Sequence, residues 1–168
     1  DSWQRPNMEK VLTHELSHIA LYRSVGGQRL PRWFVEGVAI QQAGENDLTR
    51  IKTLWQAVVA GDVVRLSELD ESFPSRPHQV SVAYAESADI IAHMRRGDSE
   101  ARRFRSLLRK VREEDMTFDE AFLDSYEMSL RTMEREWRDR LDERFQTIPL
   151  IITGGGAWVL ASILLLIA

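Results

Sequence analysis

Residues 7 to 145 carry a succession of helical patterns, and this feature limits the fold more than any other in the chain. Apolar residues recur three or four positions apart, as on one face of a helix, most clearly from Leu130 to Phe145. No stretch alternates strictly between apolar and polar residues, the pattern typical of strands. We therefore predict a mainly α fold with six or seven helices that pack in sequence order.

Glycine, proline and capping residues mark where these helices should begin and end. The first helix is predicted to start after Asn7 and to stop at Gly26 and Gly27. The second should begin near Pro31 and end near Gly44. The segment 70–79, "DESFPSRPHQ", has two prolines and is predicted to be a loop. Further helices are expected over 48–61, 80–96, 100–114 and 128–145. A short helix is also expected after the capping box at 117–120.

The chain ends in a run without charge. Residues 148–168 read "IPLIITGGGAWVLASILLLIA", and a helix of these 21 residues would be roughly 31 Å long, the thickness of the hydrocarbon core of a bilayer. A buried core helix is the alternative, but such helices rarely stay apolar on every face for this length. We expect a folded domain over 1–146 and a transmembrane helix over 148–168 that anchors it as a single-pass protein.

Composition excludes one class of partner and narrows the metal chemistry. The net charge is −4, and the 22 Lys and Arg residues are interleaved with 26 Asp and Glu residues, so no basic face for nucleic acid is expected. The chain has no cysteine, which excludes disulfides and thiolate metal sites. Any metal must therefore bind to histidine and carboxylate side chains.

The segment "LTHELSHIAL", residues 12–21, offers such side chains. On a helix His14 and His18 lie on the same face and can present two imidazoles to one cation. Glu15 points about 100° around the helix, beside the cation, where it suits a base acting on metal-bound water. The apolar neighbours, Leu16 and Ile19 among them, predict that this helix is buried in a domain. The alternative interpretation is two ordinary histidines in an amphipathic helix.

A catalytic zinc site takes three protein ligands and leaves a fourth position for water. Glu36 in "PRWFVEGVAIQ" follows His18 by 18 positions, enough for a helix, a turn and the start of a returning helix. A solvent-facing carboxylate is the alternative. However, Glu36 stands among apolar residues such as Trp33 and Val38, where a carboxylate needs a partner, and a cation would supply it.

The two segments together resemble a known family. "HELSH" followed by "PRWFVEGVA" is similar to the gluzincin zinc metallopeptidases, the group that contains thermolysin and the aminopeptidase N family. The resemblance is strongest to small bacterial peptidase MA-like domains, in which Gly and Ala follow the ligand glutamate as Gly37 and Ala39 do here. The specific matches cover residues 10–44. Such domains are usually extracytoplasmic, which is the location that the resemblance implies.

The resemblance implies roles for five residues. His14, His18 and Glu36 would bind one zinc ion per chain, and Glu15 would be the general base that activates the metal-bound water. In aminopeptidase-like members a tyrosine from the following helical region donates to the developing oxyanion, and Tyr84 is the candidate by position. Its alternative role is that of a tyrosine packed in the core.

Two departures from the family pattern are visible. Thermolysin relatives carry an Asp four residues after the ligand glutamate that orients the first histidine, and this position is Ile40 here. Gluzincins also place a β-sheet before the zinc-binding helix, whereas Asp1 lies only a few residues upstream of it. We therefore expect the chain to be a fragment from which the sheet is missing.

The predicted function is that of a membrane-anchored zinc metallopeptidase acting on a peptide or protein substrate. The alternative is an inactive pseudopeptidase that serves as a membrane-tethered binding or assembly module, and a third interpretation is a helical membrane protein with a chance motif. The presence of His14, Glu15, His18 and Glu36 together favours the first. The sequence does not distinguish an endopeptidase from an aminopeptidase, and it does not indicate the oligomeric state.

Overall fold

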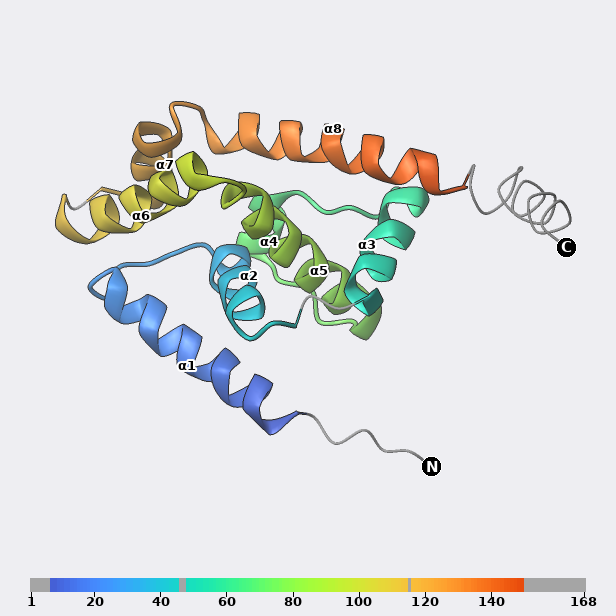
Figure 1. Ribbon diagram of the computed structural model, residues 1–168, viewed down its shortest axis with the longest axis horizontal. Helices are drawn as coiled ribbons and strands as arrows, with labels where there is room; N and C mark the ends of the chain where they lie inside the picture. The colour runs from blue at the N-terminus through green and yellow to red at the C-terminus, as the bar shows by residue number, and fades with distance from the viewer. Residues whose placement is uncertain (1–6, 46–47, 115, 150–168) are drawn as a thin grey trace, which may run out of the picture.

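The structure, a computed structural model, describes residues 7–45, 48–114 and 116–149. These residues form eight helices and no strand, so the prediction of a mainly helical fold is confirmed for this part of the chain (Figure 1). The helices are α1 (Met8–Ser24), α2 (Arg32–Gln42), α3 (Leu48–Ala60), α4 (Leu66–Glu71), α5 (Pro77–Met94), α6 (Asp98–Glu113), α7 (Phe118–Tyr126) and α8 (Leu130–Pro149).

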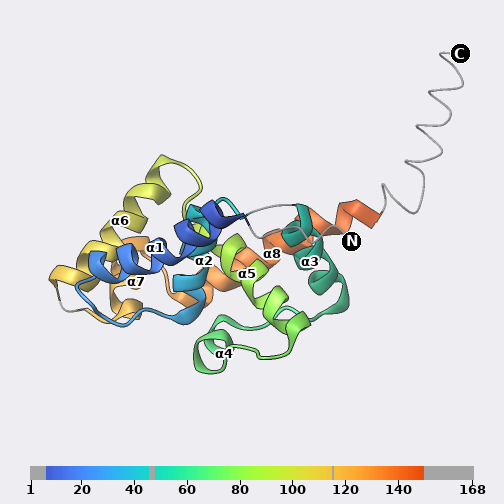
Figure 2. The same ribbon diagram turned by 90° about the horizontal axis from the view of Figure 1, so that it is seen from below.

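Helix α5 lies at the centre of the arrangement. Helix α2 packs more extensively on α5 than any other described pair of helices pack on each other, and α3 and α8 also contact α5. Helix α1 covers α2 on one side of the molecule, and α8 runs along the opposite side (Figures 1 and 2). The prediction that the helices pack in sequence order is therefore wrong, because α2 and α5 are separated in the chain by α3 and α4.

One hydrophobic core fixes α2 in place. The Trp33 and Phe34 side chains at the start of α2 are fully buried. The ring of Phe34 stacks on Phe104 of α6 at 5.4 Å and meets Phe118 of α7 edge-on at 5.0 Å. Burial of large aromatic side chains contributes strongly to stability. Glu36, two positions after Phe34, thus stands on a well-anchored helix.

Most predicted helix ends agree with the structure. Asn7 caps α1 by accepting a hydrogen bond from the Glu9 amide at 3.1 Å, and the capping box of Thr117 and Glu120 is present at the start of α7. The predicted loop at 70–79 is wrong at both ends: α4 extends to Glu71, and α5 begins at Pro77. Proline is compatible with the first turn of a helix, where its missing N–H has no partner to lose.

The predictions of a transmembrane helix and of a single-pass membrane location are corrected by the structure. Across 7–45, 48–114 and 116–149, no helix has the length and apolar character needed to cross a membrane. In α8, the buried apolar residues lie four positions apart on one face as far as Phe145, and charged residues cover the other faces. Of the predicted span 148–168, Ile148 and Pro149 end α8, and the rest lies outside the described residues.

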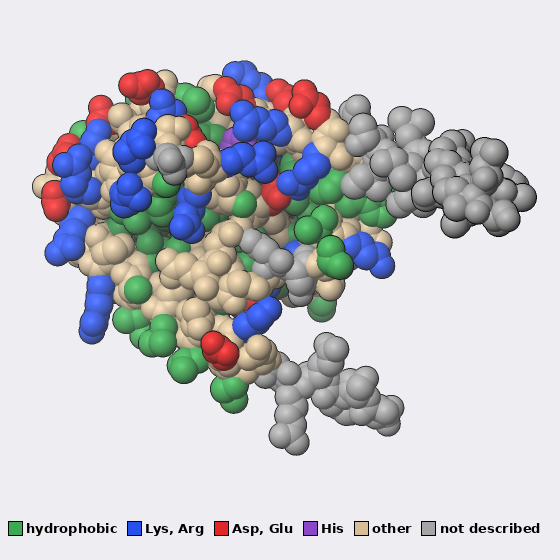
Figure 3. All heavy atoms as spheres, in the orientation of Figure 1, with side chains coloured by type: hydrophobic (Ala, Val, Ile, Leu, Met, Phe, Trp, Pro, Cys, Tyr) green, Lys and Arg blue, Asp and Glu red, His purple; other side chains and the backbone are tan. Residues whose placement is uncertain are grey.

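The expectation that α1 is buried in the domain is also wrong. Only Ser17 and Leu21 of this helix are buried. Its apolar side chains Leu12, Leu16 and Ile19 are each more than half exposed, and hydrophobic side chains line the lower edge of the molecule over α1 (Figure 3). The histidine face of α1 packs toward α2, whereas Leu12, Leu16 and Ile19 are exposed.

Candidate metal centre

The three predicted ligand residues lie on two neighbouring helices. His14 and His18 belong to α1, and Glu36 belongs to α2. Two hydrogen bonds hold these helices together: Ser17 Oγ donates to Gln42 Oε1 at 2.6 Å, and Lys10 Nζ donates to the Gly44 carbonyl at 3.1 Å. These bonds join α1 to the C-terminal end of α2 and help to fix the histidines relative to the glutamate.

The structure brings the potential donor atoms of these residues together. Glu36 Oε2 lies 3.6 Å from His14 Nε2 and 3.8 Å from His18 Nε2, and one donor atom from each residue lies within 4.8 Å of the others. Donors that bind one tetrahedral zinc ion at about 2.0–2.2 Å are roughly 3.4 Å apart. The spacing of the three side chains therefore fits a zinc ion.

The cluster formed by His14, His18 and Glu36 is partly open to solvent. The exposed fractions of the side chains are 18% for His14, 28% for His18 and 15% for Glu36. The two imidazole rings meet edge to face, with centroids 4.9 Å apart and planes at 77°. A structural metal site is usually closed by protein, whereas a catalytic site keeps one position accessible to water. The partial exposure agrees with the second kind of site.

Arg32 is a cationic neighbour of Glu36. Arg32 Nε lies 4.0 Å from Glu36 Oε1, on the previous turn of α2, and the Arg32 guanidinium stacks over the ring of Phe73 at 4.3 Å. The Arg32 side chain is more than half exposed, so this ion pair is weak. Because Arg32 approaches Oε1, the other oxygen of the carboxylate is the one that faces His14 and His18.

A family model described as the Peptidase MA superfamily matches residues 3–143. The chain belongs to the peptidase MA superfamily. This match confirms the family-level part of the resemblance, and the matched range includes all five candidate site residues. No curated protein and no solved structure gives a significant match. Membership of the superfamily supports a peptidase activity for this chain.

The other two candidate residues of this peptidase MA chain lie on α1 and α5. Glu15 is exposed on α1, directly beside His14. Tyr84 on α5 is half-buried, and its ring packs against Phe73 at 5.2 Å. Burial raises the pKa of the Tyr84 hydroxyl, and the negative charge of Glu36 raises it further. Tyr84 therefore lies within electrostatic range of the cluster and keeps its proton.

An apolar cavity adjoins the cluster. It has a volume of about 640 Å³ and includes His18 and Glu36 in its lining. The remaining wall comes from the end of α1, the α1–α2 connection and the start of α2, with apolar side chains Leu21, Val25, Leu30 and Val35. The peptidase MA chain thus has an apolar space directly next to its candidate ligands.

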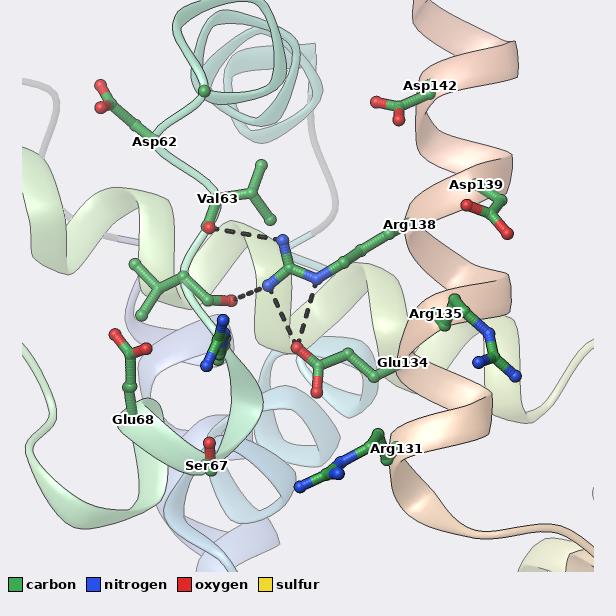
Figure 4. Close-up of a pocket in the computed structure, with 13 residues that line it drawn as sticks. Asp62, Val63, Ser67, Glu68, Arg131, Glu134, Arg135, Arg138, Asp139 and Asp142 are labelled. Carbon is green, nitrogen blue, oxygen red and sulfur yellow. Dashed lines mark hydrogen bonds and ion pairs between the residues drawn. The ribbon is translucent and has the colours of Figure 1, made fainter.

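A larger cavity, of about 900 Å³, lies between residues 61–68 and α8, and it shares no residue with the cluster (Figure 4). Arg138 crosses it and donates to the carbonyl of Val64 at 2.6 Å and to Glu134 Oε1 at 3.1 Å. The polar groups of Arg138, Val64 and Glu134 are therefore already hydrogen-bonded to one another. We assign no functional site to this cavity.

One residue near the cluster was not identified from the sequence. Glu45 Oε1 lies 3.4 Å from His14 Nδ1, although Glu45 is separated from His14 by 31 positions and lies beyond the end of α2. No spacing rule connects a residue at that place with the HExxH motif. Only the packing of α1 on α2 reveals the proximity.

Proposed function

We propose that this chain is a zinc-dependent metallopeptidase of the HExxH gluzincin type, related to thermolysin and aminopeptidase N, that hydrolyses bonds in peptide or protein substrates. The observation that carries the proposal is the convergence of His14, His18 and Glu36 within 4.8 Å in a chain of the peptidase MA superfamily. Two imidazole nitrogens and one carboxylate oxygen form a ligand set found in catalytic zinc sites of peptidases.

His14 and His18 would hold the zinc ion through Nε2, and Glu36 through Oε2, because these are the atoms that face one another. When bound, zinc lowers the pKa of a coordinated water to about 7 and polarises the carbonyl of the scissile bond. The partial exposure of the three side chains supports access of a substrate to this place.

Glu15 and Tyr84 would carry the proton chemistry. The Glu15 carboxylate accepts a proton from the attacking water while the water oxygen bonds to the carbonyl carbon. Glu15 then delivers that proton to the nitrogen that leaves when the C–N bond breaks. The Tyr84 hydroxyl donates a hydrogen bond to the carbonyl oxygen as negative charge develops there. The exposure of Glu15 and the protonated state of Tyr84 suit these roles.

Metal content is the first test of the proposal. The purified chain is dialysed against buffer containing zinc and then against buffer without it, and its zinc content is measured by elemental analysis. We expect one zinc ion per chain, retained in Glu15→Gln and lost in His18→Ala and Glu36→Gln. His78→Ala, which changes an exposed histidine, is the matched control. Zinc retained in Glu36→Gln would remove Glu36 from the ligand set, and a folded parent without zinc would overturn the proposal.

Hydrolysis of a mixed library of fluorescence-quenched peptides is the second test. We expect the zinc-loaded parent to cleave peptides and Glu15→Gln to lose this activity while it keeps its zinc. Cleavage that persists in Glu15→Gln would exclude Glu15 as the base. A parent that holds zinc but cleaves no peptide or protein substrate would favour the pseudopeptidase alternative.

A further inference from the structure

The two ring nitrogens of His14, Nδ1 and Nε2, have different surroundings. His14 Nδ1 is buried and has no hydrogen-bond partner among the described residues, while Nε2 of the same ring faces Glu36. A neutral imidazole carries its proton on one nitrogen, and an acceptor near Nδ1 would keep the proton there and leave the Nε2 lone pair free. The carboxylate oxygen Oε1 of Glu45 lies 3.4 Å from Nδ1, on the side of the ring where this acceptor is needed.

The end of α2 fixes the backbone of Glu45. Gly44 adopts a left-handed conformation with φ +62° just after the C-cap residue Ala43. The Glu45 amide then donates to the Ile40 carbonyl at 3.1 Å, and the Gly44 amide donates to the Gln41 carbonyl at 3.4 Å. This pair of bonds is the Schellman motif that terminates many helices. Glu45 therefore leaves α2 in a defined direction, toward α1.

Arg50 of α3 holds the side chain of Glu45. Its Nη2 lies 2.6 Å from Glu45 Oε2, and its Nε donates to the Glu45 backbone carbonyl at 2.9 Å. Both side chains are about three-quarters buried, so this pair is better shielded from water than a surface ion pair. Because Arg50 occupies Oε2, the other oxygen of the carboxylate is directed to His14.

The same turn also positions α1. Lys10 Nζ donates to the Gly44 carbonyl, and Lys10 lies one helical turn before His14. The turn that carries Glu45 is thus connected to α1 at two points one turn apart. In contrast, Ile40, at the position where thermolysin relatives carry an orienting Asp, is a fully buried residue whose apolar side chain offers no acceptor.

We propose that Glu45 is a positioning residue that orients His14 and fixes its tautomer for metal binding, an inference that rests on the proposed function. Glu45 acts through the imidazole and not on the cation, because it lies on the Nδ1 side of the ring and is not part of the group of donors within 4.8 Å. Acceptors of this kind orient metal-binding histidines and raise their affinity for the ion. The Arg50–Glu45 pair holds this acceptor in place.

The first test uses the metal-free chain and is independent of zinc binding. Long-range ¹H–¹⁵N NMR spectra, recorded with both imidazoles neutral, report which nitrogen of each histidine carries the proton. We expect the Nδ1–H form for His14 in the parent and a shift toward the Nε2–H form in Glu45→Ala. His18 is the internal reference, and Glu114→Ala, which removes an exposed carboxylate at the C-cap of α6, is the matched control. A His14 tautomer that is the same in parent and Glu45→Ala would overturn the proposal.

The second test measures zinc affinity by competition with a chromophoric chelator. We expect Glu45→Ala to weaken zinc binding by about 10- to 100-fold and Glu114→Ala to leave it unchanged. A Glu45→Ala variant that folds and binds zinc as tightly as the parent would overturn the positioning role while leaving the proposed function intact. A parent that binds no zinc would instead refute the proposed function, and the NMR test would still decide whether Glu45 sets the His14 tautomer.

Discussion

Gly37 of α2 lies so close to the backbone of Ser87 on α5 that a β-carbon on Gly37 would be 2.2 Å from the Ser87 carbonyl oxygen. The same β-carbon would lie 2.6 Å from Cγ1 of Ile91, one turn further along α5. Backbone atoms inside a helix cannot move away without distorting it. The close contact of α2 with α5 therefore requires glycine at this position, directly beside Glu36.

Gly37→Ala should destabilise the fold. In a helix without this contact, replacement of glycine by alanine stabilises by about 1 kcal/mol. Here the overpacking should outweigh that gain and lower the free energy of unfolding by about 2–3 kcal/mol. Urea unfolding followed by circular dichroism measures the difference. An unchanged or increased stability would show that α2 and α5 are not in the close contact described.

The helical fold could be predicted largely from the sequence, because capping residues and glycines act locally. Asn7 and the capping box at Thr117 mark helix starts through hydrogen bonds to residues only two or three positions away. The packing could not be predicted in this way. The contact of Gly37 with Ser87 joins residues 50 positions apart, and nothing in either local sequence indicates the partner. For the same reason the apolar neighbours of His14 suggested a buried helix, although most of them are exposed.

The candidate site, like the fold, could be predicted from the sequence only in part. The spacing of His14 and His18 places two imidazoles on one helix face, and the apolar surroundings of Glu36 indicated that its carboxylate has a partner. Both indications depend on short stretches of chain. Glu45 depends instead on how the end of α2 meets α1 and α3, which is a property of the packed structure. Residues that orient a ligand from a distant turn are therefore the part of a site that a motif does not reveal.

Tyr126→Phe should weaken the core by removing one buried hydrogen bond. The Tyr126 hydroxyl donates to the Met94 carbonyl at 3.0 Å, and the tyrosine side chain is fully buried. Loss of the donor leaves a buried carbonyl without its partner, which costs about 1–2 kcal/mol. Urea unfolding measures this loss, with Tyr22→Phe, a change of an exposed tyrosine, as the control. Equal stabilities of the two variants would contradict the expectation.

Tyr84→Phe should lower the rate of peptide hydrolysis without removing the metal. If the Tyr84 hydroxyl stabilises charge only in the transition state, kcat should fall by about 100-fold while KM and zinc content stay near those of the parent. His78→Ala, a change of an exposed histidine outside the cluster and its neighbouring cavity, serves as the control. A change confined to KM would instead indicate a role in substrate binding.

Glu86 makes the stability of the fold depend on pH. Its side chain is fully buried on α5, where Oε1 accepts a hydrogen bond from the Val64 amide at 3.0 Å and Oε2 has no hydrogen-bond partner among the described residues. Burial raises the pKa of Glu86 to about 8, against an ordinary value of 4.5; the Val64 hydrogen bond and the positive charge of Arg138 oppose this increase. The folded chain therefore keeps a proton on Glu86 at neutral pH.

Glu86→Gln should remove this pH dependence. Between pH 4.5 and 8 the unfolded chain releases the Glu86 proton and the folded chain retains it, so the free energy of unfolding of the parent falls as the pH rises through this window. Glutamine stays neutral, and the variant should exceed the parent at pH 8 by on the order of 2–4 kcal/mol, with the difference vanishing near pH 4.5. Urea unfolding at pH 5 and pH 8 tests this, with Glu68→Gln, an exposed glutamate of the cavity in Figure 4, as the matched control. A parent and a Glu86→Gln variant that lose stability equally between these pH values would show that Glu86 is ionised in the folded chain.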